Sequence, residues 1–489
     1  MDNSANLTIG ESGAISVASF LAPRTIAVIG AAPAEQRSIR GMLLLVLRRA
    51  GYKGRIAPVN PSHREINGLP CYPAIGAVDF PVDLAIIALP AELVCDIVEQ
   101  CAAAGVRAAI IISSGFAEEG SDRAKLQTKL SQIARRTGIR ICGPNCEGFY
   151  NIVDGIAATF SAAAEPSELD RSPPHGARRV AVVAQSGGLG FAVLNRGRAL
   201  GLSFGHVVTT GNECDLTATD FVAYFACDPG TAIIIAYLEE VRDAARFAAA
   251  AELARANGKT VIAIKIGRSE AGRRAARAHT ASDTGSVADH CAMLAQAGVI
   301  AVADPDEAVA MALALTTSPI AEGRRVGIVT TAGGAGAVLS DCFDAAGFAV
   351  PALSRPLQAS LRPTFPAYGS AANPVDVTAQ GIFTGGILRT LQILLGCDEV
   401  DLIVLVVSLS SERSVSLDIE ALQALNARRS KPVLIYSYTL PSPVARASLS
   451  RAGIAMFARV GDLRAAMRAL ARTDHPHAAV AIESELQAP

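Results

Sequence analysis

One histidine stands in a segment whose composition suggests phosphate chemistry. In RRAARAHTASDTGS, residues 273–286, His279 follows several arginines and precedes a stretch rich in Ser, Thr and Gly. A neutral imidazole is a nucleophile toward phosphorus, and its phosphorylated form carries negative charge that the protein must stabilise. The pattern therefore indicates that His279 carries a phosphoryl group. The other six of the seven histidines lack such surroundings, and we interpret them as ordinary surface or core residues.

Two Gly-rich turns are the candidates for stabilising that charge. AQSGGLG (184–190) and TTAGGAG (330–336) each follow an apolar run and precede a helical pattern. Such turns let the backbone N–H groups of a helix N-terminus face an anion, although tight turns also use glycine for steric reasons alone. We expect one phosphate to lie between the turns at 186–190 and 333–336.

A phosphorylated histidine also needs an acceptor for its second ring nitrogen, which fixes the tautomer. Glu239 directly follows the apolar run AIIIAYL, at the carboxyl end of an expected strand. We predict that Glu239 is this acceptor; the alternative is an ordinary carboxylate at a strand end.

The elements that must position these residues repeat one pattern three times. Short apolar runs alternate with segments of helical period, which is typical of parallel sheets covered on both faces. The fold class is therefore α/β, with three consecutive Rossmann-like or flavodoxin-like, doubly wound parallel sheets. The expected strands are 25–30, 55–60, 83–89, 108–113 and 139–143, then 180–185, 206–210, 232–238, 261–266 and 299–302, then 324–330, 401–407, 432–438 and 454–458.

Segments rich in Pro, Ser and charge set the domain boundaries. We predict an N-terminal tail (1–20), a first domain (21–160), a linker (161–179), a second domain (180–318), a third domain (319–472) and a C-terminal tail (473–489).

Composition excludes several classes of protein. The 489 residues carry a formal net charge of −1, so no global field attracts nucleic acid or an anionic membrane. The apolar runs are far shorter than the ~20 residues that cross a bilayer. The first residues resemble no secretory signal, which predicts the cytoplasm. We interpret the ten scattered cysteines as mostly reduced core thiols, and we expect no metal site.

A nicotinamide dehydrogenase is the first alternative. The turn VIGAAPAEQRSIRG (28–41) is not G-x-G-x-x-G, and VNPSH stands where an acidic residue would bind the ribose. The sequence therefore disfavours a nicotinamide dinucleotide.

Seven motifs, taken together and in order, resemble one family. They are GPNCEG (143–148), AQSGGLG (184–190), TTGNECD (209–215), YLEEV (237–241), AHTASDTG (278–285), TTAGGAG (330–336) and NPVDVT (373–378). Over roughly residues 20–470 the chain resembles the α subunit of ADP-forming acyl-CoA synthetases, relatives of succinyl-CoA synthetase. The resemblance implies a CoA-binding first domain, a ligase domain with a phosphohistidine, and a third, flavodoxin-like domain.

The resemblance also implies roles for single residues. His279 is similar to the transient phosphohistidine and Glu239 to the carboxylate that hydrogen-bonds it. The phosphate-stabilising helix N-termini would be headed by Ser186, Gly187 and Gly188, and by Gly333 and Gly334. The residues implied for CoA are Gly30, Ala31, Ala32, Ser38, Asn60, Pro61, Pro90, Ser113, Ser114, Asn145 and Cys146. Phe191, where succinyl-CoA synthetase has Tyr, argues against succinate as the substrate.

The implied activity joins a carboxylic acid to CoA, with ATP converted to ADP and phosphate through an acyl phosphate. No segment after residue 472 is long enough for an ATP-grasp domain, so we expect ATP, ADP and Mg²⁺ on a separate ATP-grasp β subunit in a hetero-oligomer. The alternative is a non-catalytic CoA-binding regulatory module of the same fold.

Overall fold

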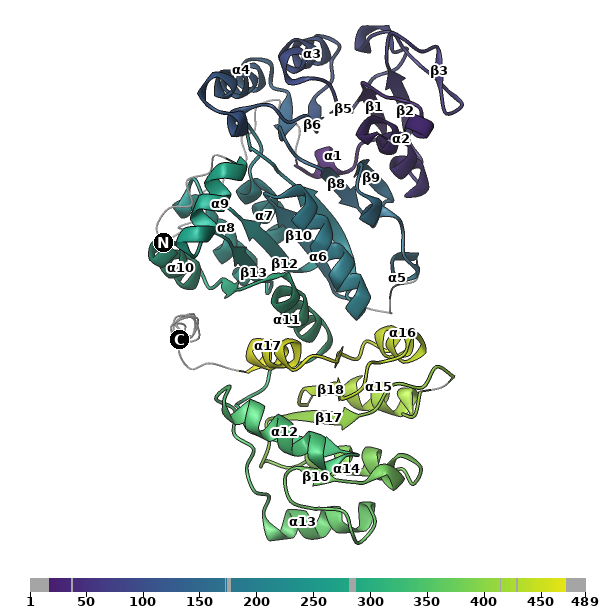
Figure 1. The fold of residues 1–489 in the computed structure, drawn as a ribbon, viewed down its shortest axis with the longest axis vertical. Coiled ribbons are helices and arrows are strands. Elements are labelled where there is room, and N and C mark those ends of the chain that lie inside the picture. Colours follow the sequence, from purple (N-terminus) through teal and green to yellow (C-terminus); the bar gives the residue numbers. More distant parts are fainter. Residues whose placement is uncertain are drawn as a thin grey trace, which may run out of the picture. The chain divides into compact units, whose positions relative to one another are not determined.

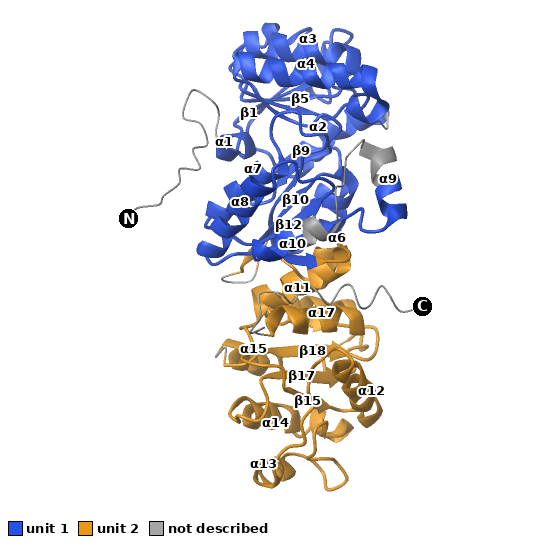
Figure 2. Ribbon diagram, turned by 90° about the vertical axis from the view of Figure 1, so that its left-hand side faces the viewer, with its two compact units in different colours: residues 1–170, 180–195, 204–301 blue, residues 171–179, 196–203, 302–489 orange. Residues whose placement is uncertain are grey.

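The structure is a computed structural model that describes residues 17–36, 38–171, 173, 177–280, 287–413, 415–427 and 430–471; within these ranges the side chains of 36, 276–280 and 287–291 are not described. The chain divides into two compact units, which Figure 2 colours separately. Unit 1 comprises residues 1–170, 180–195 and 204–301, and unit 2 comprises residues 171–179, 196–203 and 302–489.

The first sheet of unit 1 is fully parallel, with the strand order β2-β1-β5-β6-β7. Its strands are β1 (Thr25–Ile29), β2 (Arg55–Val59), β5 (Leu84–Ile87), β6 (Ala108–Ile111) and β7 (Arg140–Cys142). Its helices are α2 (Ile39–Arg49), α3 (Ala91–Ala103) and α4 (Ser121–Thr137), and a two-stranded sheet, β3 (Glu65–Ile66) with β4 (Leu69–Pro70), follows β2. The strand order reverses at β1, where such sheets bind ligands beyond the carboxyl ends of their strands.

Alternate residues of β1 face opposite sides of this sheet, as the period of a strand requires. Ile26 and Val28 belong to the same core cluster as Leu43 and Leu47 of α2. Ala27 and Ile29 instead belong to the cluster that contains α3 and α4 (Figure 1). Burial on both sides explains why the strands are continuous apolar runs in the sequence.

The second sheet of unit 1 has the order β14-β13-β12-β10-β11-β8-β9. Its strands are β8 (Gly148–Asn151), β9 (Ile156–Thr159), β10 (Arg179–Ala184), β11 (Phe204–Thr209), β12 (Thr231–Leu238), β13 (Thr260–Lys265) and β14 (Ile300–Val302). The helices between them are α5 (Glu168–Arg171), α6 (Gly187–Leu200), α7 (Ala218–Cys227), α8 (Ala244–Ala256), α9 (Glu270–Thr280) and α10 (Val287–Gln296).

The hairpin β8–β9 was not predicted. It pairs antiparallel with β11 and so extends the second sheet, although it falls within the range 21–160 predicted for the first domain. Its strands are only four residues long, and neither GFYN nor IAAT stands out as a strand pattern. Helix α1 (Val17–Leu21) strengthens the junction, because the Phe20 ring lies 5.8 Å from that of Phe149 and 6.0 Å from that of Phe221. The two sheets of unit 1 therefore share one core.

Unit 2 contains the third sheet, with the order β16-β15-β17-β18-β19 and all strands parallel. Its strands are β15 (Val326–Thr330), β16 (Val375–Asp376), β17 (Leu402–Val407), β18 (Val433–Ser437) and β19 (Met456–Phe457). Its helices are α11 (Pro305–Thr317), α12 (Gly333–Asp344), α13 (Arg355–Leu361), α14 (Gly386–Leu395), α15 (Ile419–Ala427), α16 (Pro443–Arg451) and α17 (Val460–Leu470). Strand β16, only two residues long, was not predicted. Helix α11, which lies in the range 180–318 predicted for the second domain, packs against α17 of this unit.

Three mostly parallel sheets with flanking helices confirm the predicted α/β class. Within the residues that the structure describes, no helix has the length and apolar character needed to cross a membrane.

A buried carboxylate fixes the start of the third sheet. Asp401 precedes β17, and its Oδ2 accepts hydrogen bonds from the backbone N–H of Arg325 at 2.8 Å and from Arg325 Nε at 3.0 Å, while Oδ1 accepts from Nη2 at 2.6 Å. These hydrogen bonds lower the pKa of Asp401. The pair therefore joins the residues that immediately precede β15 and β17 through a charged contact.

We expect Asp401→Asn to lower the free energy of unfolding by about 1–3 kcal/mol at pH 7, because it weakens these charged hydrogen bonds. A carboxyl with a lowered pKa in the folded state stabilises above its unfolded pKa, and this contribution is lost as the pH falls. The difference between wild type and variant should therefore shrink from about pH 5 toward pH 3. Urea unfolding followed by circular dichroism measures it, with the exposed Glu322→Gln as control; a difference that grows in acid would contradict the assignment.

Candidate active site

The residues assigned to CoA gather at the carboxyl edge of the first sheet. Gly30 directly follows β1 with φ of +85°, and its N–H donates to the carbonyl of Val59 at 2.9 Å. A Cβ on Gly30 would lie 2.6 Å from the carbonyl oxygen of Ala88, so this close approach requires glycine. Asn60, after β2, donates from Nδ2 to the carbonyl of Ala31 at 2.8 Å. The ends of β1, β2 and β5 therefore meet at one place.

The remaining members of the set lie at the same edge or next to it. Ser113 Oγ, after β6, accepts from the backbone N–H of Leu89, directly before Pro90, at 3.1 Å. The N–H of Asn145 donates to the carbonyl of Ser113 at 2.9 Å. Pro61, Pro90 and Ser114 are exposed, Ala31 and Ala32 are buried, and Ser38 caps α2 by accepting from the N–H of Gly41. The structure thus brings these residues together, while their contacts with CoA stay a prediction.

Cys146 differs from the rest of the set because it is only 4% exposed. Its thiol donates to the carbonyl of Ile111 at 3.4 Å. In this conformation the Cys146 side chain supports the GPN loop from within the core rather than facing a ligand.

A second loop, whose residues had no predicted role, holds the GPN loop. In the motif TTGNECD, the N–H groups of Asn212 and Cys214 donate to the carbonyls of Pro144 and Gly143, both at 2.9 Å. A Cβ on Gly211 would lie 2.3 Å from the Pro144 oxygen, so the two backbones are in close contact. Arg242 donates in turn to the carbonyls of Asn212 at 3.0 Å and Glu213 at 2.8 Å.

Glu213 is the buried carboxylate of this second loop. Its Oε1 accepts hydrogen bonds from Thr210 Oγ1 and from the N–H of Ala218, both at 2.8 Å. Burial raises the pKa of Glu213 despite these hydrogen bonds. The residue therefore orders the loop at the cost of desolvating a carboxylate.

The first predicted phosphate turn follows β10. Ser186 precedes α6, which begins at Gly187, and the N–H of Gly190 donates to the Ser186 carbonyl at 3.1 Å. Gly187 and Ser186 are partly exposed and Gly188 is exposed, so the first turn of this helix is open to a ligand. The prediction of a Gly-rich turn leading directly into a helix N-terminus is confirmed here.

Gln185 connects this turn to the predicted carboxylate Glu239. Gln185 Oε1 accepts from the N–H groups of Glu239 at 2.6 Å and Glu240 at 2.9 Å, and its Nε2 donates to the Glu240 carbonyl at 2.8 Å. Lys265, at the end of β13, donates from Nζ to the Glu239 carbonyl at 2.6 Å. Sequence reasoning missed both Gln185 and Lys265; their positions at strand ends were the available signal. Glu239 itself is only 4% exposed.

His279 belongs to α9, but its side chain and residues 281–286 lie outside the described part of the chain. Of the preceding arginines, Arg274 pairs with Glu270 at 3.1 Å on the surface of the helix. The pairing of His279 with Glu239 therefore stays a prediction.

The second predicted phosphate turn lies in unit 2. Helix α12 begins at Gly333, and Thr330 Oγ1 stabilises the preceding turn by accepting from the N–H of Ala332 at 3.0 Å. A Cβ on Gly333 would lie 2.9 Å from Asp376 Oδ2, whereas Gly334 has open space beside it. This turn therefore repeats the strand–turn–helix arrangement of the first.

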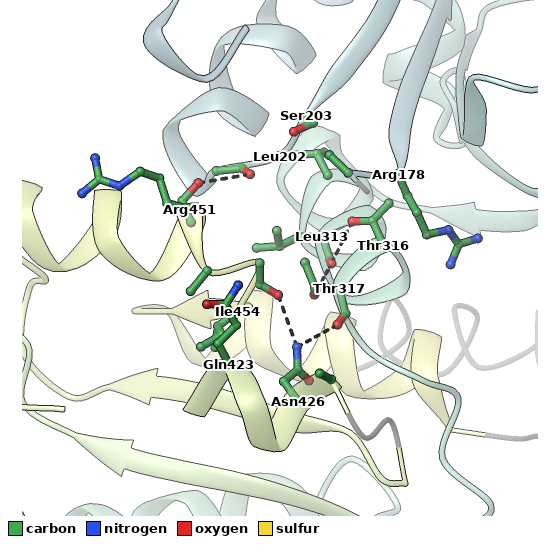
Figure 3. Close-up of a pocket in the computed structure, with 16 residues that line it drawn as sticks. Arg178, Leu202, Ser203, Leu313, Thr316, Thr317, Gln423, Asn426, Arg451 and Ile454 are labelled. Atoms are coloured by element: carbon green, nitrogen blue, oxygen red, sulfur yellow. Dashed lines mark hydrogen bonds between the residues drawn. The ribbon is translucent and has the colours of Figure 1, made fainter. Parts of the chain in front are cut away.

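A cavity of about 230 Å³ also lies within unit 2 (Figure 3). Asn426 Nδ2 donates there to the carbonyls of Thr317 at 3.3 Å and Gly453 at 3.4 Å. None of the predicted site residues lines this cavity, and we assign it no part in the reaction.

Three domain families match the chain in the order of the sheets. They are the CoA binding domain (residues 24–151), the succinyl-CoA ligase like flavodoxin domain (177–315) and the ligase-CoA domain (326–408). Together with the fold they place the chain in the class of proteins built from CoA-binding and CoA-ligase domains.

Relatives identify the branch. The α subunit of ADP-forming acetate–CoA ligase II from Pyrococcus furiosus is 32% identical over 92% of this chain and 96% of its own length. The α subunit of isozyme I from the same organism is 34% identical over 74% of this chain and 77% of its own. The chain belongs to the family of ADP-forming acetate–CoA ligases. Two further relatives are longer than this chain. The one from Archaeoglobus fulgidus is 34% identical over 83% of this chain, which spans 57% of that relative's length. The one from Methanocaldococcus jannaschii is 32% identical over 73% of this chain, which spans 48% of that relative's length.

Solved structures agree. The apo form of dinucleotide forming acetyl-coenzyme A synthetase 1 from Ca. Korarchaeum cryptofilum has a TM-score of 0.78 at 28% identity, over 93% of this chain and 96% of the other. Its complex with phosphate and ADP has a TM-score of 0.77 at 29% identity, with the same coverage. These findings confirm the resemblance drawn from the motifs.

The raised pKa of Glu213 gives a test of the loop. A carboxyl with a raised folded pKa stabilises below its unfolded pKa, and this contribution is lost as the pH rises through the folded value. We therefore expect the free energy of unfolding of the wild type, relative to Glu213→Gln, to fall as the pH rises above the ordinary range of a glutamate carboxyl, by ~1.4 kcal/mol for each unit by which the pKa is raised. Urea unfolding of both proteins measures this, with the exposed Glu65→Gln as control; a constant difference would show that Glu213 is not desolvated.

Proposed function

We propose that the chain is the CoA-binding, phosphohistidine-carrying subunit of an ADP-forming acid–CoA ligase. One observation carries the proposal: within unit 1, the N-terminus of α6 is tied to the Glu239 backbone by Gln185, in the same compact unit as the predicted CoA edge. An anion site and a CoA edge in one unit suit a reaction that passes through an acyl phosphate.

The proposed reaction divides one condensation into three transfers. The γ-phosphoryl group of ATP passes to His279, releasing ADP. A carboxylate substrate then attacks the phosphohistidine to give an acyl phosphate. Finally the CoA thiol attacks the acyl carbon, and phosphate leaves.

The chain's own residues serve these steps through charge and position. The first turns of α6 and α12 would stabilise the phosphoryl group, each contributing ~0.3–2 kcal/mol toward an adjacent anion. Glu239 would accept a hydrogen bond from the second nitrogen of His279 and so fix its tautomer. Lys265 and Gln185 would hold the Glu239 backbone in place for that contact.

The proposal includes a separate ATP-grasp subunit that binds ATP with Mg²⁺. The Pyrococcus furiosus relatives, which this chain matches over most of their lengths, are named as α subunits, and this supports a partner. The location would be the cytoplasm.

The carboxylic acid substrate has several candidates. Relatives are named for acetate, 4-hydroxybutyrate and trans-feruloyl-CoA, and acetate is the first candidate to test.

Phosphorylation of His279 is the first test. Incubation with acetyl-CoA and labelled phosphate should give an acid-labile, base-stable label on the chain, because the last two transfers are reversible. His279→Asn should abolish the label, whereas His475→Asn, which removes an imidazole with no assigned role, should retain it. Label that survives His279→Asn would refute the assignment. A chain that binds CoA but never becomes labelled would favour the regulatory module.

Dependence on a partner is the second test. The purified chain should form no acetyl-CoA from ATP, acetate and CoA, and addition of an ATP-grasp subunit encoded beside it or purified with it should restore turnover. The measurement is release of ADP coupled to formation of the thioester. Sustained ATP-dependent turnover by the single chain would contradict the predicted division of labour.

A further inference from the structure

Glu147 connects the two halves of the proposed site in unit 1. It directly follows Cys146 in the GPN loop, and its side chain reaches the first residue of α6. A Cβ on Gly187 would lie 2.8 Å from Glu147 Cγ and 3.1 Å from its Cβ. The carboxylate therefore stands between the loop assigned to CoA and the helix assigned to phosphate.

The backbone at this position is fixed. The N–H of Glu147 donates to Thr209 Oγ1 at 2.9 Å, and that hydroxyl donates to the carbonyl of Gly148 at 2.8 Å. Gly148 has φ of +88°, and a Cβ there would lie 2.0 Å from the carbonyl oxygen of Ala158. The carboxylate is thus presented from a rigid loop, as a catalytic group must be.

One oxygen of this carboxylate lacks a hydrogen-bond partner in the part of the chain that the structure describes. Among the residues that the structure describes, Glu147 Oε2 is buried and makes no hydrogen bond. A buried polar atom without a partner costs roughly 1–3 kcal/mol, and a ligand that supplies a hydrogen-bond partner would remove that cost. The Glu147 side chain packs against Gly187, which has no titratable group of its own.

The last transfer of the proposed reaction needs a proton acceptor. The thiolate is the nucleophilic form of a thiol, and a thiol of ordinary pKa near 8.5 is mostly protonated at neutral pH. Of the other carboxylates around the GPN loop, Glu118 accepts from the N–H groups of Gly115 and Phe116, and Glu213 from Thr210 and Ala218. Both are committed to loop structure, whereas Glu147 Oε2 has no hydrogen-bond partner in the described part of the chain.

We propose that Glu147 is the general base that accepts the thiol proton of CoA as its sulfur attacks the acyl phosphate, an inference that rests on the proposed function. The sulfur–carbon bond forms, the carbon–oxygen bond to phosphate breaks, and phosphate leaves with that electron pair. The thiol proton goes to Glu147 Oε2 and then to phosphate or water. Glu147 thereby becomes neutral beside the departing anion, which relieves their repulsion.

Burial raises the pKa of Glu147, which brings the carboxyl closer to the range where a general base is most effective near neutral pH. The positive end of the α6 dipole favours the ionised carboxylate before transfer.

Two reactions of acetyl phosphate separate this role from the rest of the mechanism. With CoA and no nucleotide, the chain in complex with its partner should form acetyl-CoA and phosphate. Without CoA, it should transfer the phosphoryl group to His279. Glu147→Gln should slow formation of acetyl-CoA roughly 10²-fold or more, the usual range for general-base catalysis. It should leave phosphorylation of His279 within about threefold of wild type.

A matched control variant and a chemical rescue complete this test. Glu252→Gln, an exposed glutamate paired with Arg255, should change neither reaction. Formate, but not chloride, should partly restore acetyl-CoA formation to Glu147→Ala. An unchanged rate of acetyl-CoA formation in Glu147→Gln, an equal loss of both reactions, or no rescue by formate would overturn the role of Glu147. Failure of wild type in both reactions would instead overturn the proposed function.

Discussion

Two backbone hydrogen bonds hold together the two parts of the proposed site in unit 1. Those from Asn212 to Pro144 and from Cys214 to Gly143 tie the end of the first sheet to the loop after β11 of the second. The GPN loop then runs directly into β8, which pairs with β11. The predicted CoA-edge residues and the N-terminus of α6 thereby belong to one compact unit, and a hydrophobic core cluster spans both of its sheets. Glycines at 143, 148 and 211 are needed because the backbones approach too closely for a Cβ.

The sequence was sufficient to predict most of this framework. Strands buried on both faces are apolar runs bounded by turn residues, so the principal strands of all three sheets were predicted. The hairpin β8–β9 and the two-residue β16 were missed because their pairing is long-range and leaves little local pattern. The association of the first two sheets in one unit also depends on contacts such as Phe20 with Phe149 and Phe221, which no local rule predicts.

In the candidate site, residue type and position at strand ends predicted which segments lie close together. They did not predict the hydrogen bonds that hold these segments in place. Gln185 and Lys265 were missed because neither is unusual in sequence; only the fold brings their side chains to the Glu239 backbone, across neighbouring strands. The burial of Cys146 was equally unpredictable, since a cysteine in a Gly/Pro loop has no preferred direction. The proposed function therefore rests on the combined motifs, and the supporting contacts come from the structure.

The two Gly-rich turns also differ in a way that bears on chemistry. Each begins a helix beside a carboxylate, Glu147 near Gly187 and Asp376 near Gly333. Asp376 Oδ1 accepts from the N–H of Thr378 at 2.8 Å, so this carboxylate has a structural partner in its own loop. Glu147 Oε2 has none in the described part of the chain. Because a buried carboxylate oxygen without a partner destabilises the fold, the contrast argues that position 147 serves a ligand rather than the turn.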